Sequence, residues 1–298
     1  MCKDSIFKNR GNVYMKRKIY DSLVNWKKEK NGTTALLIEG ALRIGKSYIA
    51  EEFARNEYES YILIDFSKAP SRVKGWFDEY LEDVDTLLQN IQLHYKKQLT
   101  PRRSLIILDE VQKCPRAREA VKALVADHRF DYLETGSLIS IKKNVENIVI
   151  PSEEDGIDMY PMDFEEFLWA MGNEVLMPYI RSCFEKRRPM GDFHRVALHY
   201  FRQYLIVGGM PQAVAEYASS RDFTRVDAVK RQILRLYKND INISPIEVKS
   251  GTNYTLTSIN KCIKKFGQYL GTPYVLHTKD IDLKDGLVYL PLYMTPLL

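Results

Sequence analysis

Apolar and polar residues follow two alternating patterns along the first half of the chain. Short apolar runs of the kind found in buried parallel strands predict strands at 34–39, 61–66, 102–110 and 130–137, and a further one within 148–162. Between these runs, apolar residues recur every three or four positions, which predicts helices over 14–29, 75–97 and 115–127. Together they indicate an α/β domain with a central parallel sheet.

The pattern changes at Asp163, where helical periodicity replaces the alternation. Helices are expected over 164–171, 176–185, 195–205 and 226–237, and a Gly-Gly-Met-Pro turn at 208–211 interrupts them. Further on, the pattern predicts a short strand at 245–249, a helix at 256–269 and strands at 273–278 and 286–290. We therefore expect three parts: an α/β core over 1–165, a helical region with a lid or winged-helix-like module over 166–243, and a small α/β end over 244–298.

The turn after the first strand reads Gly40-Ala41-Leu42-Arg43-Ile44-Gly45-Lys46-Ser47, a complete G-x-x-x-x-G-K-S loop, or Walker A motif. Its glycines let backbone N–H groups approach a β-phosphate, Lys46 supplies a positive charge, and the Ser47 hydroxyl is suited to ligate Mg²⁺. The loop predicts a nucleoside triphosphate ligand. The alternative is an ordinary glycine turn, which the flanking strand and helix disfavour. Arg43 could face a phosphate, a neighbouring protomer or solvent.

A second apolar run ends in Asp109-Glu110, 63 residues after Lys46, and has the form of a Walker B strand. Asp109 would hold Mg²⁺ through water or Ser47, and Glu110 would align the water that attacks the γ-phosphate. A solvated acidic turn is the alternative. In P-loop hydrolases whose sheet has an additional strand, a polar residue at the tip of that strand contacts the γ-phosphate. Thr135 and Ser137 are candidates here, and a plain turn fits equally well.

Composition narrows the class of protein. The chain has 298 residues, of which 45% are hydrophobic and 28% charged, and a net charge of +5. We find neither a run of about 20 apolar residues nor a signal-peptide pattern at the N-terminus, and so expect a cytoplasmic protein without a membrane span. The four cysteines and five histidines are too scattered to indicate a metal site. Basic clusters at 16–18, 27–30 and 186–188 are interpreted as solvated helix faces, with an acidic partner such as DNA as the alternative.

Near the C-terminus, Glu247 and Lys249 lie two apart on a predicted strand and should face the same side. This is the E-x-K half of a restriction-type nuclease site, which also needs an Asp from a preceding strand. Only Asp240 lies upstream, at the end of a predicted helix. We favour the alternative interpretation, an alternating strand that carries two exposed charges.

In order, these motifs resemble those of a large group of bacterial and archaeal AAA-type ATPases with a C-terminal domain of unknown function that ends in a nuclease-like fold. The residues that carry the resemblance are Gly40 to Ser47, Leu105 to Gln112, Glu134 to Ser137, Met159 to Phe167, Gly208 to Pro211 and Ile246 to Gly251. It implies an AAA-type ATPase domain over 1–165, a winged-helix-like region over 166–243 and a nuclease-like end over 244–298. In the family, a long stretch separates the last helix of the middle region from the E-x-K strand. In this chain only Ile241 to Pro245 lie between them. The resemblance therefore implies a shortened, catalytically incomplete end.

The resulting hypothesis is a protein that binds ATP and Mg²⁺ and hydrolyses ATP slowly, which drives a conformational change in its C-terminal half, on DNA or on a protein partner. Catalysis is assigned to Lys46 and Glu110, nucleotide binding to 40–47 and Thr135, and Mg²⁺ binding to Ser47 and Asp109. Adenine is expected because no N-K-x-D guanine motif is found. The alternatives are a non-hydrolysing switch or DNA-binding adaptor, and a metal-dependent nuclease; a kinase fits the Asp-Glu pair less well. No motif indicates an oligomeric state.

Overall fold

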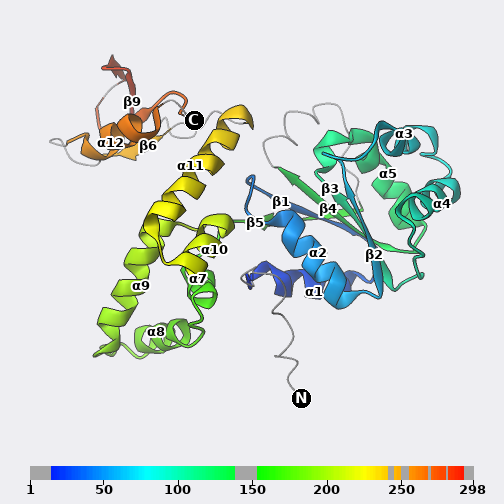
Figure 1. Cartoon of the computed structure of the whole chain (residues 1–298), viewed down its shortest axis with the longest axis horizontal. Coiled ribbons are helices and arrows are strands. Elements are labelled where there is room, and N and C mark those ends of the chain that lie inside the picture. The colour runs from blue at the N-terminus through cyan, green and yellow to red at the C-terminus, as the bar shows by residue number, and fades with distance from the viewer. Residues whose placement is uncertain are drawn as a thin grey trace. The chain divides into compact units, whose positions relative to one another are not determined.

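The structure is a computed structural model that describes residues 15–137, 153–240, 245–249, 255–267, 270–279 and 281–291, without the side chains of 238–240. Two compact units divide the chain, Met1–Val226 and Asp227–Leu298 (Figure 1). Expectations that fall on Tyr14, on 148–152 and on the Asp240 side chain lie outside the described residues. The three-part division over 1–165, 166–243 and 244–298 stays a prediction.

A five-stranded parallel sheet forms the centre of the first unit, in the order β2-β3-β4-β1-β5. The strands are β1 (Ala35–Gly40), β2 (Ser60–Asp65), β3 (Ser104–Asp109), β4 (Asp131–Ser137) and β5 (Glu154–Met159). Because β4 lies between β1 and β3, the sheet is of the additional-strand type. The α/β fold predicted from the sequence is confirmed.

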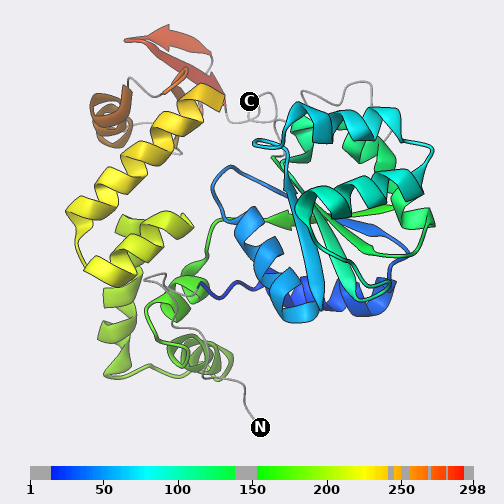
Figure 2. The same ribbon diagram turned by 45° about the vertical axis from the view of Figure 1, so that its right-hand side comes forward.

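Helices cover both faces of this sheet (Figure 2). α1 (Ile19–Lys30) and α2 (Lys46–Glu57) pack with Leu36, Ile38 and Ile107, and fully buried Phe53 lies at the centre of this layer. On the opposite face, α3 (Ser71–Glu79), α4 (Val84–Tyr95) and α5 (Pro115–Ala126) cover a second apolar cluster that includes Leu37. Each large apolar side chain buried in these layers contributes about 1.5–3 kcal/mol. Two-sided burial explains why the strand sequences are almost uniformly apolar.

Helices account for the region that follows the sheet. They are α7 (Phe164–Ala170), α8 (Leu176–Glu185), α9 (Phe193–Val207), α10 (Pro211–Ser220) and α11 (Phe223–Asp240), the last of which continues into the second unit. The described chain from 164 to 240 holds no strand, so the winged-helix-like character stays a prediction. Across the part of the chain that the structure describes, no helix is long and apolar enough to cross a membrane.

The second unit contains a four-stranded sheet in the order β6-β7-β9-β8. β6 (Ile246–Val248), β7 (Tyr274–His277) and β9 (Leu287–Pro291) are parallel, and β8 (Asp282–Lys284) is antiparallel to β9. Ile259 of helix α12 (Thr257–Phe266) packs in one cluster with Val275, Leu287 and Tyr289 of this sheet. The sequence did not indicate β8, because its three residues are exposed and two of them are charged.

A buried acidic pair lies on the α5 face of the first sheet. Glu134 of β4 is completely buried, and Arg118 of α5 donates to both carboxylate oxygens of Glu154 of β5, at 2.7 and 3.2 Å. Burial, and secondly the charge of Glu154, raise the pKa of Glu134 well above its ordinary value of 4.5, while Arg118 acts in the opposite direction. The folded protein therefore keeps a proton on this carboxyl at pH values where the unfolded chain has lost it.

We expect Glu134→Gln to flatten the pH dependence of stability above about pH 5. In the wild type the folded state binds the additional proton, so the free energy of unfolding falls as pH rises above the unfolded pKa, by up to about 1.4 kcal/mol per pH unit. Glutamine mimics the protonated acid and removes this slope. Urea unfolding of both proteins between about pH 5 and pH 8 measures it, with Glu119→Gln on the surface of α5 as the control. Parallel pH profiles for wild type and Glu134→Gln would contradict the prediction.

Candidate functional site

The phosphate-binding loop connects the end of β1 to the start of α2. Gly40 closes the strand at φ 152°, and a Cβ there would come within 2.2 Å of the Met159 carbonyl oxygen. Gly45 precedes the helix at φ 95°, a left-handed conformation that glycine adopts without strain. The first turn of α2, all of it described, has neither an acidic residue nor a capping side chain. The N–H groups of this helix end therefore suit an anion such as a phosphate.

Lys46 has its ammonium group folded back over the loop. The Nζ atom donates to the carbonyl oxygens of Gly40 at 3.0 Å and Ala41 at 2.8 Å, and the side chain is almost fully buried. Burial lowers the pKa of Lys46, while the charges of Glu110 and Asp109 oppose that shift. The Lys46 Nζ atom is thus held against two carbonyl oxygens of the loop, where a polyphosphate could take their place as its partner.

Three side chains predicted from separate motifs, and one backbone N–H group, meet in one hydrogen-bonded chain. Asp109 Oδ1 accepts from Ser47 Oγ at 2.7 Å and from Thr135 Oγ1 at 2.5 Å. The Thr135 hydroxyl in turn accepts from the backbone N–H of Glu110 at 3.2 Å. These groups come from α2, β3 and β4, so the central strand order brings them together. Ser137, the other candidate on β4, is also buried, at the end of the strand opposite Gly40.

Glu110 has a left-handed backbone conformation, with φ at 57° and ψ at 47°. For a residue other than glycine this costs about 1–2 kcal/mol and is found mostly where the surrounding structure needs a particular side-chain direction. Gln112 donates from Nε2 to Glu110 Oε2 at 2.5 Å, which fixes the carboxylate. The sequence alone did not predict this role of Gln112, although an amide two residues after the acidic pair was an available signal.

Arg17 corrects the interpretation of the first basic cluster as a solvated helix face. Its side chain is 4% exposed and lies against Glu166, whereas Lys16 and Lys18 are 48% and 42% exposed. One of its nitrogens, Nη1, donates to the Ile44 carbonyl oxygen in the phosphate-binding loop, at 2.8 Å. Periodicity could not reveal this, since the partner residues are distant in sequence. Arg43 is exposed, with φ at 64°. Whether it faces a phosphate, a neighbouring protomer or solvent stays open.

The E-x-K pair lies in the second unit. Glu247 Oε1 and Lys249 Nζ are 3.0 Å apart, so the two side chains share one side of β6. The expectation that both charges are exposed was wrong: their side chains are 12% and 21% exposed, whereas apolar Ile246 and Val248 are 49% and 61% exposed. Among the residues that the structure describes, no three His, Cys, Asp or Glu side chains form a group that could hold a metal ion.

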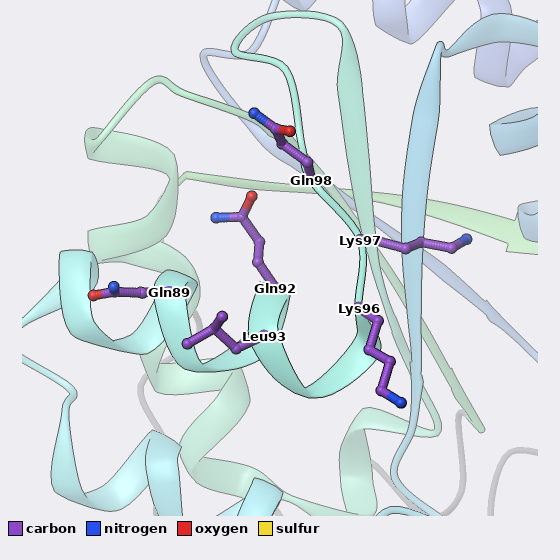
Figure 3. Close-up of a pocket in the computed structure, with 6 residues that line it drawn as sticks. All are labelled: Gln89, Gln92, Leu93, Lys96, Lys97 and Gln98. Carbon is purple, nitrogen blue, oxygen red and sulfur yellow. The ribbon is translucent and has the colours of Figure 1, made fainter.

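A shallow hollow of about 430 Å³ lies at the C-terminal end of α4 (Figure 3). It is lined by Gln89, Gln92, Leu93, Lys96, Lys97 and Gln98. Lys97 Nζ donates to the Tyr61 carbonyl oxygen at 2.9 Å, and Gln92 accepts from the backbone of Leu99. These contacts lie at the amino ends of β2 and β3, the edge of the sheet opposite the phosphate-binding loop. The hollow is therefore separate from the nucleotide site.

Two family models match parts of this chain. Residues 32–168 match the family model described as AAA domain, and residues 198–259 match a domain of unknown function, DUF8612. None of the curated proteins matches this chain in sequence.

Solved structures show weaker likeness. The Walker-type ATPase paby2304 of Pyrococcus abyssi has 14% identity and a TM-score of 0.44, with 85% of this chain and 77% of that chain covered. ORC1 of Aeropyrum pernix, solved in complex with DNA, has 13% identity and a TM-score of 0.42, with 76% of this chain and 70% of that chain covered. PCH-2 of C. elegans has 14% identity and a TM-score of 0.35, with 72% of this chain and 65% of that chain covered. These TM-scores are low, so residues 32–168 are assigned to an AAA-type domain from the family match and the strand order.

The matched segment contains the loop at 40–47, the acidic pair Asp109-Glu110 and Thr135. The additional strand β4 lies between the strands that carry the first two motifs. Residues 32–168 of this chain therefore form an AAA-type domain with the P-loop fold.

Proposed function

We propose that the chain binds ATP together with Mg²⁺ and hydrolyses it, and that hydrolysis changes the contacts of the helices that follow the core. The observation that supports this most directly is the hydrogen-bonded chain from Ser47 through Asp109 and Thr135 to the backbone of Glu110. It connects a residue suited to Mg²⁺ with the residue suited to activate water. A protein that only bound nucleotide would need the first of these residues and not the second.

The residues present fit Mg²⁺ in the way that P-loop proteins hold it. Mg²⁺ prefers oxygen ligands and is usually held by one or two protein groups together with water and substrate phosphates. Ser47 Oγ and Asp109 Oδ1 lie 2.7 Å apart at the mouth of the loop and offer such a pair. When bound, Mg²⁺ would neutralise charge on the β- and γ-phosphates.

The protein's own groups divide the work of hydrolysis. The amides at the start of α2 and the Lys46 ammonium bind the phosphates and stabilise the negative charge that develops on them. The Glu110 carboxylate, fixed by Gln112, orients the attacking water and accepts its proton. We propose that Thr135 responds to the γ-phosphate, and its hydrogen bonds to both Asp109 and the Glu110 backbone support this role. We assign the nucleotide contacts to the whole loop from Gly40 to Ser47 and to Thr135.

The partner acted on is proposed to be DNA or a protein. A net charge of +5 favours an acidic partner. The non-hydrolysing switch or DNA-binding adaptor remains the alternative, and the turnover measured below separates it from the ATPase.

The first prediction is that Lys46→Ala loses nucleotide binding while the protein stays folded. The variant removes the charge that the loop holds among its carbonyl oxygens, so we expect affinity for ATP to fall at least about a hundredfold. Titration with a fluorescent ATP analogue in Mg²⁺ measures affinity, and circular dichroism checks the fold. Lys122→Ala, on the exposed surface of α5, is the control. Equal affinity of Lys46→Ala and wild type would remove Lys46 from the site.

The second prediction is that Glu110→Gln binds ATP and Mg²⁺ as the wild type does and loses hydrolysis. The amide keeps the size of the side chain and cannot accept the proton, so we expect steady-state turnover to fall about 10²–10⁴-fold. Glu119→Gln on α5 is the matched control. If Glu110→Gln turns over at the wild-type rate, another residue activates water. No turnover by the wild type itself would favour the non-hydrolysing switch.

The same turnover assay distinguishes the partners. It is run with and without duplex DNA at about 50 and about 200 mM salt, because binding to phosphates weakens steeply as salt rises. Stimulation by DNA at low salt that is lost at high salt would identify DNA as the partner, and an unchanged rate would favour a protein.

The third prediction concerns the metal-dependent nuclease. Glu247 and Lys249 form an ion pair, and in the described part of the second unit no strand precedes β6 to supply a further carboxylate. We therefore expect no cleavage of plasmid or linear DNA in Mg²⁺ or Mn²⁺. Gel electrophoresis of the DNA checks this, with Glu247→Ala as the contamination control. Cleavage by the wild type that disappears in Glu247→Ala would establish a nuclease site.

A further inference from the structure

We propose that Arg17 is a positioning residue that holds the phosphate-binding loop in the shape that receives phosphate and couples the loop to α7 and α10. This inference rests on the proposed nucleotide function and concerns a residue outside the Walker motifs and outside the segment that matches the AAA domain. The resulting link explains two conspicuous sequence blocks, 159–167 and 208–211, that catalysis itself does not use.

The Arg17 guanidinium group joins three separate segments in the first unit. Nη1 donates to the Ile44 carbonyl oxygen at 2.8 Å, Nη2 to the Tyr160 carbonyl oxygen at 2.6 Å, and Nε to Glu166 Oε1 at 3.1 Å. The first acceptor lies in the phosphate-binding loop, the second just after β5 and the third in α7. With its side chain only 4% exposed, the group is shielded from water that could replace these bonds. Charged hydrogen bonds in such surroundings are strong and directional.

The bond to Ile44 fixes the direction of an amide that faces the nucleotide. The Ile44 carbonyl and the Gly45 N–H belong to one planar peptide group, in which the two bonds point in opposite directions. Since Arg17 holds the carbonyl on its own side, the Gly45 N–H points away from Arg17. The fully buried Ile44 side chain anchors the same peptide from within the core. Arg17 thereby orients one of the N–H groups on which phosphate binding depends.

The bond to Glu166 fixes the start of α7. Glu166 Oε1 also accepts from the backbone N–H of Lys18 at 2.7 Å, and its other oxygen accepts from the backbone N–H of Asp163 at 3.1 Å. Asp163 accepts in return from the Glu166 N–H at 2.9 Å, which completes a capping box. The N-terminus of α7 is thus bonded to the arginine that holds the loop.

The bond to Tyr160 extends the link to α10. Two residues on, the Met162 N–H donates to the Gly209 carbonyl oxygen at 2.7 Å. A Cβ at Gly209 would come within 2.2 Å of the Met162 carbonyl oxygen, so only glycine allows this approach. Pro211, the first residue of α10, lies close to the loop: its Cγ would be 3.8 Å from a Cβ atom added at Gly45. A shift of the loop is therefore transmitted to both helices.

The test compares wild type with Arg17→Met, which removes all five N–H donors, and with Arg17→Lys, which keeps the charge and lacks the planar fork. Arg118→Met is the matched control, because Arg118 is a second buried, ion-paired arginine that does not bond to the loop. The first readout is affinity for the ATP analogue AMP-PNP with Mg²⁺, measured below the unfolding temperature of every variant. We expect it to weaken about tenfold or more in Arg17→Met, less in Arg17→Lys, and by less than about twofold in Arg118→Met.

The second readout is the difference in amide hydrogen exchange between the free protein and the protein at saturating AMP-PNP, because this difference shows which segments respond to nucleotide. In the wild type, we expect nucleotide to slow exchange at 40–47 and also at 159–167 and 208–211. In Arg17→Met, protection should be confined to 40–47. If Arg17→Met does not fold, Arg17→Lys decides, with an intermediate affinity and reduced protection at 159–167 and 208–211.

The outcomes separate the two proposals. Wild-type affinity and an unchanged exchange pattern in both Arg17 variants overturn the role of Arg17 and leave the nucleotide function standing. Equal weakening in Arg17→Met and Arg118→Met also overturns it, since the effect would then be general destabilisation. A wild type that does not bind AMP-PNP overturns the proposed function and this inference together.

Discussion

The candidate site depends on the hydrogen bonds that the Asp109 carboxylate accepts. One of its oxygens accepts hydrogen bonds from Ser47 and Thr135. Ser47 lies in α2, Asp109 in β3 and Thr135 in β4, the strand between β3 and β1. Asp109 is nearly buried, so the two hydroxyls supply much of the solvation that its charge loses. The sheet can provide this arrangement only if β4 separates β1 from β3, and the strand order is thus part of the site.

A second layer of contacts connects this site to the rest of the first unit. Arg17, Glu166 and the Gly209-Met162 contact tie the loop to helices that carry no catalytic group. Buried ion pairs seldom add much net stability, because desolvation offsets their attraction. Their directional bonds do specify one arrangement, and here that arrangement joins the phosphate-binding loop to α7 and α10. In the proposed function, this connection would carry a change in the loop to the two helices.

Several features of the site and fold were predictable from sequence because they are local. The spacing within 40–47 alone indicates a phosphate loop, and the apolar run before Asp109-Glu110 indicates a buried strand whose tip is acidic. The long helices were also predicted, since their periodicity is strong. Strand β8 was missed because three exposed residues carry too little pattern, and the exposure of Glu247 was predicted wrongly because alternation gives the two faces of a strand without showing which one is covered.

The sequence by itself determined the phosphate-binding loop, the acidic strand and the order of the elements, because each of these motifs is a continuous segment. Only the tertiary structure decided which distant residues complete the site. Arg17 and Glu166 are 149 positions apart, and Arg17 and Ile44 are 27 apart. In a lysine-rich segment before a helix, a buried arginine has the same pattern as a solvated one. Its role appears once parallel strands, packed by apolar burial on both faces, bring the loop, the end of β5 and α7 within reach of one guanidinium group.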